Sequence, residues 1–334
     1  MKNIKQTSNL QVPTNIILNQ DCLKGLKLYP DKFFHCCVTS PPYFRLRDYQ
    51  VNGQIGQEQW PEEYITKLVD IFREVKRVLR PEGTIWINIG DSYFSHKKRP
   101  AELSTDVPHS NLKCKDLIGI PWMLAFALRD IGLYLRQDII WHKPSPMPEG
   151  VKDRCTKSHE YLFLLSKSRE YYYDQNAVSQ TLKISSIQRQ MRGVSSKNKY
   201  REGIPGQPVQ RIYLPRDNVK QSKRTYIERE DPAFKESKRK PASVTGQANL
   251  RSVWTLHTKG YKGNHFATFP EEIPFICIKA GCPEHGIVLD PFLGAGTTAL
   301  VARKLSRNYV GFELNPKYAQ MAMKRLHREL GIFL

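Results

Sequence analysis

The stretch from Ile287 to Glu313 constrains the fold more than any other part of the sequence. A short apolar run leads into Asp-Pro-Phe-Leu-Gly-Ala-Gly-Thr-Thr at 290–298, and a helical pattern, a second apolar run and Glu313 follow. Gly294 and Gly296 permit a tight turn and a close approach of the backbone. A strand, a Gly-x-Gly turn, a helix and a strand ending in an acid are typical of a site for a nucleoside-bearing cofactor, with the acid on the ribose hydroxyls.

The same turn argues against a dinucleotide cofactor. A dinucleotide fingerprint has a third glycine three residues after the second, whereas this chain has Ala299 at that position. Without it, the start of the following helix is not laid out for a pyrophosphate group. The stretch therefore predicts a cofactor without pyrophosphate, and a dehydrogenase is the least favoured class of enzyme.

Helical patterns alternate with short apolar runs over most of the chain. The clearest helix spans 61–80, where a proline at a favoured first position, early acids, late bases and an apolar stripe all agree. The alternation predicts an α/β fold, a doubly wound, mostly parallel sheet with helices on both faces. Seven strands are expected, at 15–18, 33–38, 84–89, 133–141, 160–166, 287–289 and 309–312. Further helices are expected at 22–28 and 120–131, from Pro270, up to Leu305 and at 316–330.

A second unusual turn, Thr-Ser-Pro-Pro-Tyr at 39–43, follows the apolar run 33–38. Two consecutive prolines fix two φ angles and remove two backbone donors, so the chain leaves the strand presenting carbonyls. Ser40 precedes the prolines and the ring of Tyr43 follows them. Acceptors beside an aromatic ring suit an exocyclic amino group on a flat base. The alternative is an ordinary loop that ends a strand, because Pro-Pro pairs mark turns.

The charge is unusually positive: 52 Lys and Arg against 32 Asp and Glu give a net +20 and an isoelectric point near 9.6. Eight lysines and nine arginines against six acids place more than half of that excess in 175–252, a stretch with little periodicity and with interleaved aromatic residues. Such a surface favours a polyanion, most simply nucleic acid. The alternatives are a basic protein without such a partner and a solvated, disordered insertion.

Several classes of protein are disfavoured. No apolar run approaches the ~18 residues of a membrane span, and 1–11 is polar, unlike a secretory signal. The seven cysteines are scattered, odd in number and without a C-x-x-C pair, which indicates reduced thiols and a cytoplasmic protein. Cys282-Pro-Glu-His285 lacks partner ligands at usable spacing, so we expect a loop there and no metal site.

Together, Ser40-Pro41-Pro42-Tyr43 and the 290–298 turn resemble the motifs of the amino-methylating DNA methyltransferases that use S-adenosylmethionine. The order of catalytic motif, basic variable region and cofactor motif is similar to that of the beta group of this family. The resemblance implies the class I methyltransferase sheet of seven strands in permuted order, with an inserted basic target-recognition region. It divides the chain into a catalytic half, 1–174, a target-recognition region, 175–252, and a cofactor-binding half, 253–334.

For catalysis the resemblance implies base flipping, because an exocyclic nitrogen cannot be reached inside a duplex. Ser40 and the carbonyl of Pro41 would accept the two amino hydrogens and draw the nitrogen toward sp3 geometry. Tyr43 would stack on the extruded base, and Pro42 is the remaining member of the catalytic motif. The sulfonium methyl group is then attacked in line, with proximity and orientation supplying most of the rate and without a covalent base adduct or a metal. We therefore expect the motif and the 290–296 turn to meet on neighbouring strand ends.

For the cofactor, the resemblance places the ribose on Glu313 and the adenine end near Asp21. The residues assigned to the methionine part and its turn share the glycine-rich segment: Asp290, Phe292, Gly294, Gly296 and Thr297. Phe269-Pro270 is a candidate for the pocket wall, and Asp91 is either on the cofactor side or structural.

The first residue of the catalytic motif is commonly Asp in the adenine-N6 enzymes of this family and Ser in the cytosine-N4 enzymes. Ser40 therefore favours N4 of cytosine, with N6 of adenine as the alternative. The implied protein is a sequence-specific methyltransferase of double-stranded DNA in a restriction-modification system, with a cognate restriction endonuclease as a partner. Competing hypotheses are a non-catalytic DNA-binding protein on the same frame and an RNA or protein methyltransferase. The sequence leaves open whether the chain is a monomer or a dimer.

Overall fold

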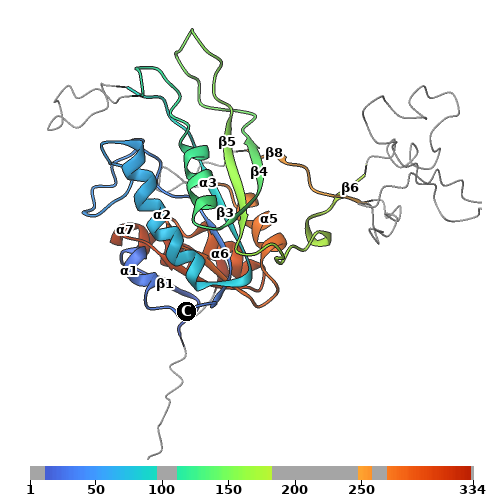
Figure 1. Cartoon of the computed structure of the whole chain (residues 1–334). Helices are drawn as coiled ribbons and strands as arrows, with labels where there is room; N and C mark the ends of the chain where they lie inside the picture. Colours follow the sequence, from blue (N-terminus) through green and yellow to red (C-terminus); the bar gives the residue numbers. More distant parts are fainter. Residues whose placement is uncertain (1–11, 96–110, 183–246, 258–268, 332–334) are drawn as a thin grey trace, which may run out of the picture. The chain divides into compact units, whose positions relative to one another are not determined.

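The computed structural model describes residues 12–95, 111–182, 247–257 and 269–331 (Figure 1). The chain forms two compact units, one made of 1–177 with 251–334 and the other of 178–250. The short elements near this division are η3 (Asn176–Val178), a 3-10 helix, and the antiparallel pair β6 (Gln180–Thr181) and β7 (Gln247–Ala248). Most of the predicted recognition region, 175–252, lies outside the described residues, so its role stays a prediction.

One sheet organises the first unit, and in the described part of the chain it has eight strands. Their order across the sheet is β1 (Ile16–Leu18), β10 (Asn308–Phe312), β9 (Ile287–Asp290), β2 (Phe34–Thr39), β3 (Leu79–Ile89), β5 (His159–Ser166), β4 (Tyr134–His142) and β8 (Val253–Thr255). Neighbouring strands run parallel except β5, which is antiparallel to β3 and β4. The predicted mostly parallel sheet is therefore confirmed.

Two predictions about the strands are wrong. The sheet has eight strands and not seven, because β8 adds an edge strand in which only Trp254 is buried. Three residues are too few for a periodic pattern to reveal a strand. In addition, β3 begins at Leu79 and not at residue 84. Its register with β2 shifts between Phe34 and Cys36, and such irregularities are where a strand tolerates a proline, here Pro81.

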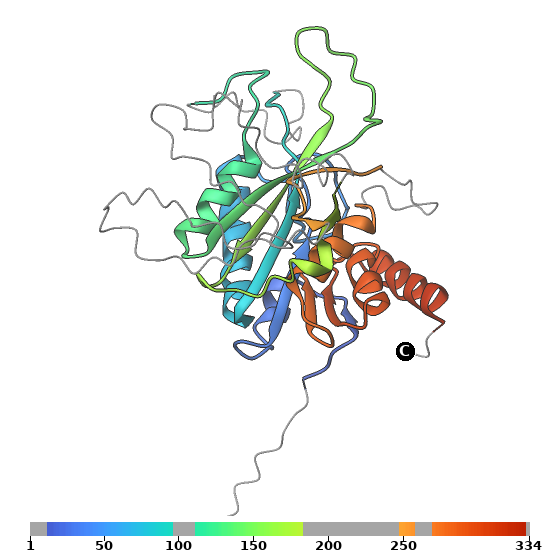
Figure 2. The same ribbon diagram turned by 90° about the vertical axis from the view of Figure 1, so that its right-hand side faces the viewer.

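Helices cover both faces of the sheet. Within the described ranges they are α1 (Cys22–Leu26), α2 (Pro61–Val78), α3 (Ile120–Asp130), α5 (Glu272–Gly281), α6 (Thr297–Lys304) and α7 (Pro316–Leu330). α1, α2 and α3 pack together on one face, and α5, α6 and α7 on the other (Figure 2). The doubly wound architecture is confirmed. None of these helices combines the length and the apolar character needed to cross a membrane.

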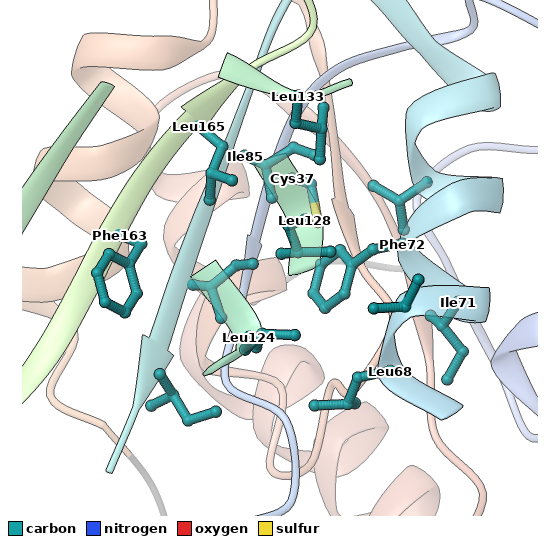
Figure 3. Close-up of a cluster of buried hydrophobic side chains, with 14 of the residues drawn as sticks. Cys37, Leu68, Ile71, Phe72, Ile85, Leu124, Leu128, Leu133, Phe163 and Leu165 are labelled. Carbon is teal, nitrogen blue, oxygen red and sulfur yellow. The ribbon is translucent and has the colours of Figure 1, made fainter. Parts of the chain in front are cut away.

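The core shown in Figure 3 lies between the sheet and the layer of α1, α2 and α3. Its buried side chains come from β2, β3, β5, α2, α3 and the residue before β4, and include Cys37, Ile85, Phe163, Leu165, Leu68, Phe72, Leu124, Leu128 and Leu133. Burying one such large side chain stabilises the fold by ~1.5–3 kcal/mol. This layer therefore holds β2 and β3 in place, and with them the loops at their carboxyl ends.

Candidate active site

The two motifs singled out in the sequence meet at one edge of the sheet. β2 and β9 are adjacent parallel strands, with Cys37 paired to Leu289, so their carboxyl ends lie side by side. The hydroxyl of Thr39 donates to Oδ1 of Asp290 at 2.6 Å, across 251 residues of sequence. The predicted convergence of the catalytic motif and the glycine-rich turn is therefore present.

A pocket opens at this edge, with an empty volume of about 750 Å³ that includes the open space at its mouth. Six of the residues predicted from the sequence line it: Asp21, Ser40, Pro42, Phe292, Gly294 and Glu313. They come from the ends of β1, β2, β9 and β10, which are neighbours in the sheet. Ligands of open α/β sheets bind outside the carboxyl ends of the strands, and the pocket has that location.

Sequence reasoning missed part of the pocket wall. Tyr49, Val51, Gln54 and Ile55 line it from the loop between β2 and α2, and Asn315 and Tyr318 line it from the start of α7. The rings of Tyr49 and Tyr318 meet edge to face, with centroids 6.2 Å apart. The α7 residues had a signal, because Asn315-Pro316 comes two residues after Glu313 and marks a helix start at the same edge. The loop residues had none, because they show no periodicity.

Glu313 is held in place by the backbone around it. Its Oε2 accepts the N–H of Gly294 at 2.8 Å, and its Oε1 accepts the N–H of Asn315 at 2.8 Å. Burial raises the pKa of this carboxyl, and the backbone hydrogen bonds lower it. Each carboxylate oxygen can accept more than one hydrogen bond, so both can also accept ribose hydroxyls. The carboxylate at the rim of a pocket lined by aromatic and apolar groups fits the nucleoside part of S-adenosylmethionine.

Asp290 lies behind the pocket and not on its surface. The residue is 2% exposed, and its Oδ1 accepts the Thr39 hydroxyl and the N–H of Phe292 at 3.0 Å. Burial raises the pKa of Asp290 to about 6, against the lowering effect of its hydrogen bonds. In this structure Asp290 ties the cofactor motif to the catalytic strand, and its predicted contact with the methionine part stays a prediction.

Gly296 and Thr297 also face away from the pocket. A Cβ on Gly296, whose φ is 80°, would lie 3.0 Å from side-chain carbons of Ala322 and Leu326, so glycine permits α6 and α7 to pack closely. The Thr297 hydroxyl accepts a hydrogen bond from Nη1 of Arg325 at 3.0 Å. These two residues therefore support the glycine-rich turn on the side that packs against α7.

Arg325 joins three segments around that turn. Its Nη1 also lies 3.4 Å from the carbonyl oxygen of Ala295, its Nη2 donates to Glu271 at 2.9 Å, and its Nε donates to Glu329 at 3.0 Å. Arg325 is 7% exposed. No local sequence pattern indicates this role, because a basic residue in an amphipathic helix normally lies on its solvated face.

The remaining cofactor candidates lie outside the pocket wall. Phe269 and Pro270 precede α5, and the Pro270 carbonyl accepts the N–H of Ile273 at 3.1 Å. The structure describes both residues but they are not among those that line the pocket, so their role in the wall stays a prediction. Asp91 was expected either to contact the cofactor or to have a structural role, and the structure shows a structural role. Its carboxylate accepts the backbone N–H groups of Gly119 and Ile120 at 3.0–3.1 Å and so holds the start of α3.

The catalytic motif is fixed in a defined conformation. The hydroxyl of Tyr64, a fully buried residue of α2, donates to the Pro42 carbonyl at 2.7 Å. No described residue donates to the carbonyl of Pro41. The Tyr43 ring packs on Gly90, where a Cβ would lie 2.7 Å from ring carbon Cε2. Burial is the main cause that raises the pKa of Tyr43, so its hydroxyl stays neutral at physiological pH.

Metal ligands are not gathered here. In the parts of the chain that the structure describes, no group of three or more His, Cys, Asp or Glu side chains is placed to hold a metal ion. Cys282 and His285, the residues with a superficial metal pattern, belong to the segment between α5 and β9.

Comparisons with known proteins agree with this geometry. A sequence model of a DNA methylase family, the N6 and N4 methylases, matches residues 34–324. The chain is 38% identical to type II methyltransferase M.Cfr9I of Citrobacter freundii over 98% of this chain and 93% of that protein. It is 39% identical to type II methyltransferase M.SmaI of Serratia marcescens over 93% of this chain and 90% of that protein.

A solved structure shows the same fold. The PvuII DNA methyltransferase, described as cytosine-N4-specific, superposes with a TM-score of 0.60 at 17% identity, over 92% of this chain and 85% of that chain. The class I methyltransferase fold is therefore present. Because the family match extends from residue 34 to residue 324 and the relatives align over nearly the whole chain, this chain belongs to the family of S-adenosylmethionine-dependent DNA methylases that modify exocyclic N4 or N6 amino groups.

Proposed function

We propose that this enzyme transfers a methyl group to the exocyclic N4 of a flipped-out cytosine at one short sequence in double-stranded DNA. The observation that carries the proposal is the meeting of Ser40 and Pro42 with Glu313 and Gly294 in one pocket. The type II methyltransferases among its relatives support a place in a restriction-modification system. A cognate restriction endonuclease is then its functional partner.

On the substrate side, the chain supplies acceptors and an aromatic plate. The amino nitrogen of a base is a poor nucleophile because its lone pair is delocalised into the ring. Ser40 and the Pro41 carbonyl accept its two hydrogens and favour a pyramidal nitrogen, whose lone pair is then available. Tyr43 stacks on the extruded base and holds its plane. Tyr64 donates to the Pro42 carbonyl. Pro41 is buried and is not among the residues that line the pocket, so the use of its carbonyl by the base is part of the proposal.

On the cofactor side, Glu313 holds the ribose, Asp21 faces the adenine end, and Phe292 and Gly294 border the rest of the pocket. When bound, S-adenosylmethionine supplies an electrophilic methyl group. The protein contributes position: the two parallel strands β2 and β9 bring the acceptors and the cofactor pocket to one edge. Holding the reactants together in this way supplies most of the rate of a bimolecular transfer.

Ser40 is the feature that favours cytosine N4 over adenine N6. The preference is a correlation within the family between the first motif residue and the target base. A hydroxyl is a weaker acceptor than a carboxylate, and nothing in the site forbids adenine. N6 of adenine is therefore the alternative within the same chemistry.

The identity of the product tests the proposal directly. The chain is expressed in a host that lacks other DNA methylation, and the DNA is analysed by nucleoside mass spectrometry and long-read sequencing. We expect N4-methylcytosine at one short sequence. N6-methyladenine would move the assignment to the alternative, and unmodified DNA from a chain that still binds S-adenosylmethionine would support the non-catalytic DNA-binding hypothesis. Competition with RNA in vitro distinguishes an RNA methyltransferase.

Removal of the Ser40 hydroxyl tests the role of the acceptors. Ser40→Ala should lower the methyl-transfer rate constant by about 100-fold, the usual effect of losing one preorganised hydrogen bond to the transition state. The dissociation constant of S-adenosylmethionine, measured by calorimetry, should change by less than about 2-fold. Thr66→Ala is the matched control, because it removes an exposed hydroxyl of α2 that bonds only its own helix at 2.8 Å. An equal loss of cofactor binding in Ser40→Ala would contradict this role.

A further inference from the structure

The connection between β4 and β5 is far longer than these two strands require. β4 ends at His142 and its antiparallel neighbour β5 begins at His159, whereas about two to five residues usually join such a pair. Residues 143–158, the arm, form no helix or strand. They project beyond the ends of the strands in Figure 1 and Figure 2. A loop of this length in a compact domain calls for a functional reason unless it is loose.

The root of the arm is fixed beside the catalytic motif. β5 is antiparallel to both β3 and β4, so the arm leaves the sheet at the edge where the loops after β2 and β3 lie. The N–H of Lys143 donates to the Ser158 carbonyl at 2.8 Å and closes the root. The Lys143 ammonium donates to one oxygen of Glu160, and the Tyr43 hydroxyl donates to the other at 2.5 Å. One carboxylate thus connects the root of the arm to Tyr43.

The returning half of the arm rests on the loop that follows β3. The guanidinium carbon of Arg154 lies 4.0 Å from the centre of the Tyr93 ring. The Lys157 ammonium donates to the Asp91 carbonyl at 2.8 Å. The arm is therefore held at its root and along its returning half, and its tip extends from the edge of the sheet that carries Ser40 and Tyr43.

The arm carries an excess of positive charge. It has four Lys and Arg residues against two acids, and both acids have cationic partners. Glu149 pairs with Arg154, and Asp153 pairs with Lys115 at 2.7 Å. Lys152 is exposed. A segment of this charge, at the reactive edge of a DNA methyltransferase, is attracted to the phosphates of a duplex.

The tip of the arm presents an apolar side chain to solvent. Met147 is 84% exposed, the largest value among the large hydrophobic side chains of the described residues. It lies among Pro144, Pro146 and Pro148, and each proline fixes one φ angle. The four residues from the root to Met147 can extend up to ~12 Å in a proline-rich conformation. A single exposed methionine has no special meaning, but one on a stiff, basic arm beside the catalytic motif has a partner within reach.

Base flipping creates the site that such a side chain fits. The extruded base loses its pairing and its stacking, and the gap that it leaves favours its return. Proteins that deform DNA insert apolar wedges, methionine and proline among them, between bases. A wedge that fills the gap has to approach from the side that receives the base. The arm projects from that side.

We propose that the arm lies against the target duplex and that Met147 enters the base stack where the target base has left it, which stabilises the flipped state. The inference rests on the proposed function and adds a DNA-contacting residue to it. Because the wedge occupies the gap and does not touch the extruded base, the inference holds for cytosine and for adenine alike.

Met147→Ala tests the wedge in the full-length protein. The probe is a duplex with the site found above and 2-aminopurine at the target position, whose fluorescence rises when the base leaves the stack. The equilibrium constant for flipping should fall about 10-fold to 100-fold, the change that corresponds to one large apolar side chain no longer buried. The single-turnover rate of methylation of the natural duplex should fall in the same direction. Met147→Leu should keep both, because leucine fills a similar volume.

Met147→Trp reports insertion itself. An indole placed between bases stacks on them, and its fluorescence is then quenched. We expect additional quenching relative to the wild-type protein with the cognate duplex and none with a duplex that lacks the site, where no base is flipped. The dissociation constant of S-adenosylmethionine should not change measurably in either variant, because Met147 does not line the cofactor pocket.

Leu28→Ala is the matched control. Leu28 is also strongly exposed, at 73%, but it lies between α1 and β2 at the opposite edge of the sheet. Its replacement removes an exposed apolar side chain without touching the arm. Flipping and the methylation rate should stay at their wild-type values.

The inference is overturned if Met147→Ala flips the base and methylates DNA as the wild type does, or if Met147→Trp is quenched equally by cognate and non-cognate duplexes. Weaker binding of every duplex with unchanged flipping would also overturn it, since the arm would then contact phosphates only. Failure of the proposed function is distinguishable, because the wild-type protein would then methylate no DNA at all.

Discussion

The buried carboxyl of Asp290 joins the glycine-rich turn to the strand that precedes the Ser-Pro-Pro-Tyr motif, and its burial lowers the stability of the folded protein when the carboxyl is charged. It links β9 to β2 through the Thr39 hydroxyl at 2.6 Å, and burial raises its pKa from 3.8 to about 6. Because the folded pKa lies above the unfolded value, the folded protein takes up this proton first as the pH falls. The cost of the charged form is present in full above pH 6 and is removed between about pH 6 and 4.

The pH dependence of stability therefore contains a contribution from Asp290. The melting temperature of the wild type, measured relative to Asp290→Asn, should rise as the pH falls from 7 to 5. Asparagine keeps an oxygen that accepts from Thr39 but carries no titrating proton, so it serves as the reference for all other groups. Calorimetry at several pH values measures the difference, and parallel profiles of the two proteins would contradict the assignment.

Arg325 supports the glycine-rich turn from the opposite side. Arg325→Met should lower the free energy of unfolding by about 2–3 kcal/mol, less than for a fully buried ion pair because Glu271 and Glu329 are partly exposed. It should also weaken S-adenosylmethionine binding, since the turn loses its tie to α7. Arg325→Lys should regain part of the stability but not the affinity, because lysine lacks the planar fork.

The control for Arg325 lies on the same helix. Arg328 is 71% exposed in its side chain and reaches Glu329 at 3.4 Å, so Arg328→Met should change stability by less than about 0.5 kcal/mol. Denaturant unfolding and calorimetric titration give both quantities. If the two substitutions changed the free energy of unfolding and the affinity for S-adenosylmethionine equally, Arg325 would not be the residue that supports the glycine-rich turn.

At the scale of elements, the loop between β2 and α2 forms one wall of the pocket at the sheet edge. Its own contacts hold it: the Glu58 carboxylate accepts the N–H of Gly56 at 2.8 Å and pairs with Lys67 at 3.0 Å. Asn315 at the start of α7 lies 3.3 Å from the Tyr49 carbonyl. The loop therefore connects the catalytic motif to the cofactor half of the site.

The aromatic contact of this loop should be measurable. Tyr49→Ala removes one ring from the wall and from its edge-to-face contact with Tyr318, and should raise the dissociation constant of S-adenosylmethionine about 10-fold, the range expected for one aromatic pair. Leu46→Ala, in the same loop but 52% exposed, should leave it unchanged. Comparable losses in both variants would point to general loosening of the loop.

Elements with a strong local signal could be predicted, and those determined by tertiary contacts could not. The local sequence contains the apolar stripe of α2, the cap of α7 and the apolar runs of β2, β9 and β10. These elements could therefore be predicted, and so could the convergence of the loops that follow β2 and β9 at one edge of the sheet. β8 has three residues, too few to show a period. The contacts of Arg325 with Thr297 and Glu271, and those of Asp91 at the start of α3, join residues 28 or more positions apart, which no local pattern contains.

At the scale of the whole molecule, the net charge of +20 predicts binding to DNA that depends steeply on salt. Each phosphate contact contributes about 0.9 to the slope of log K against log salt concentration. We expect the affinity for a non-cognate duplex to fall at least about 100-fold between roughly 50 and 200 mM salt. Affinity for S-adenosylmethionine should change far less, because its pocket is apolar and aromatic in large part. Fluorescence anisotropy measures the first quantity, and a slope near zero would contradict the prediction.

The single reversed strand of the sheet has a consequence for how the site is assembled. Parallel strands offer a cleft only the residues that follow them, whereas β5 runs the other way and delivers its first residues, His159 and Glu160, to the same rim. With the opposite polarity, its eight residues would carry Glu160 about 20 Å away to the far rim. Inverting one strand thus lets the first residues of a strand, and not only the loops that follow the parallel strands, supply side chains to this rim.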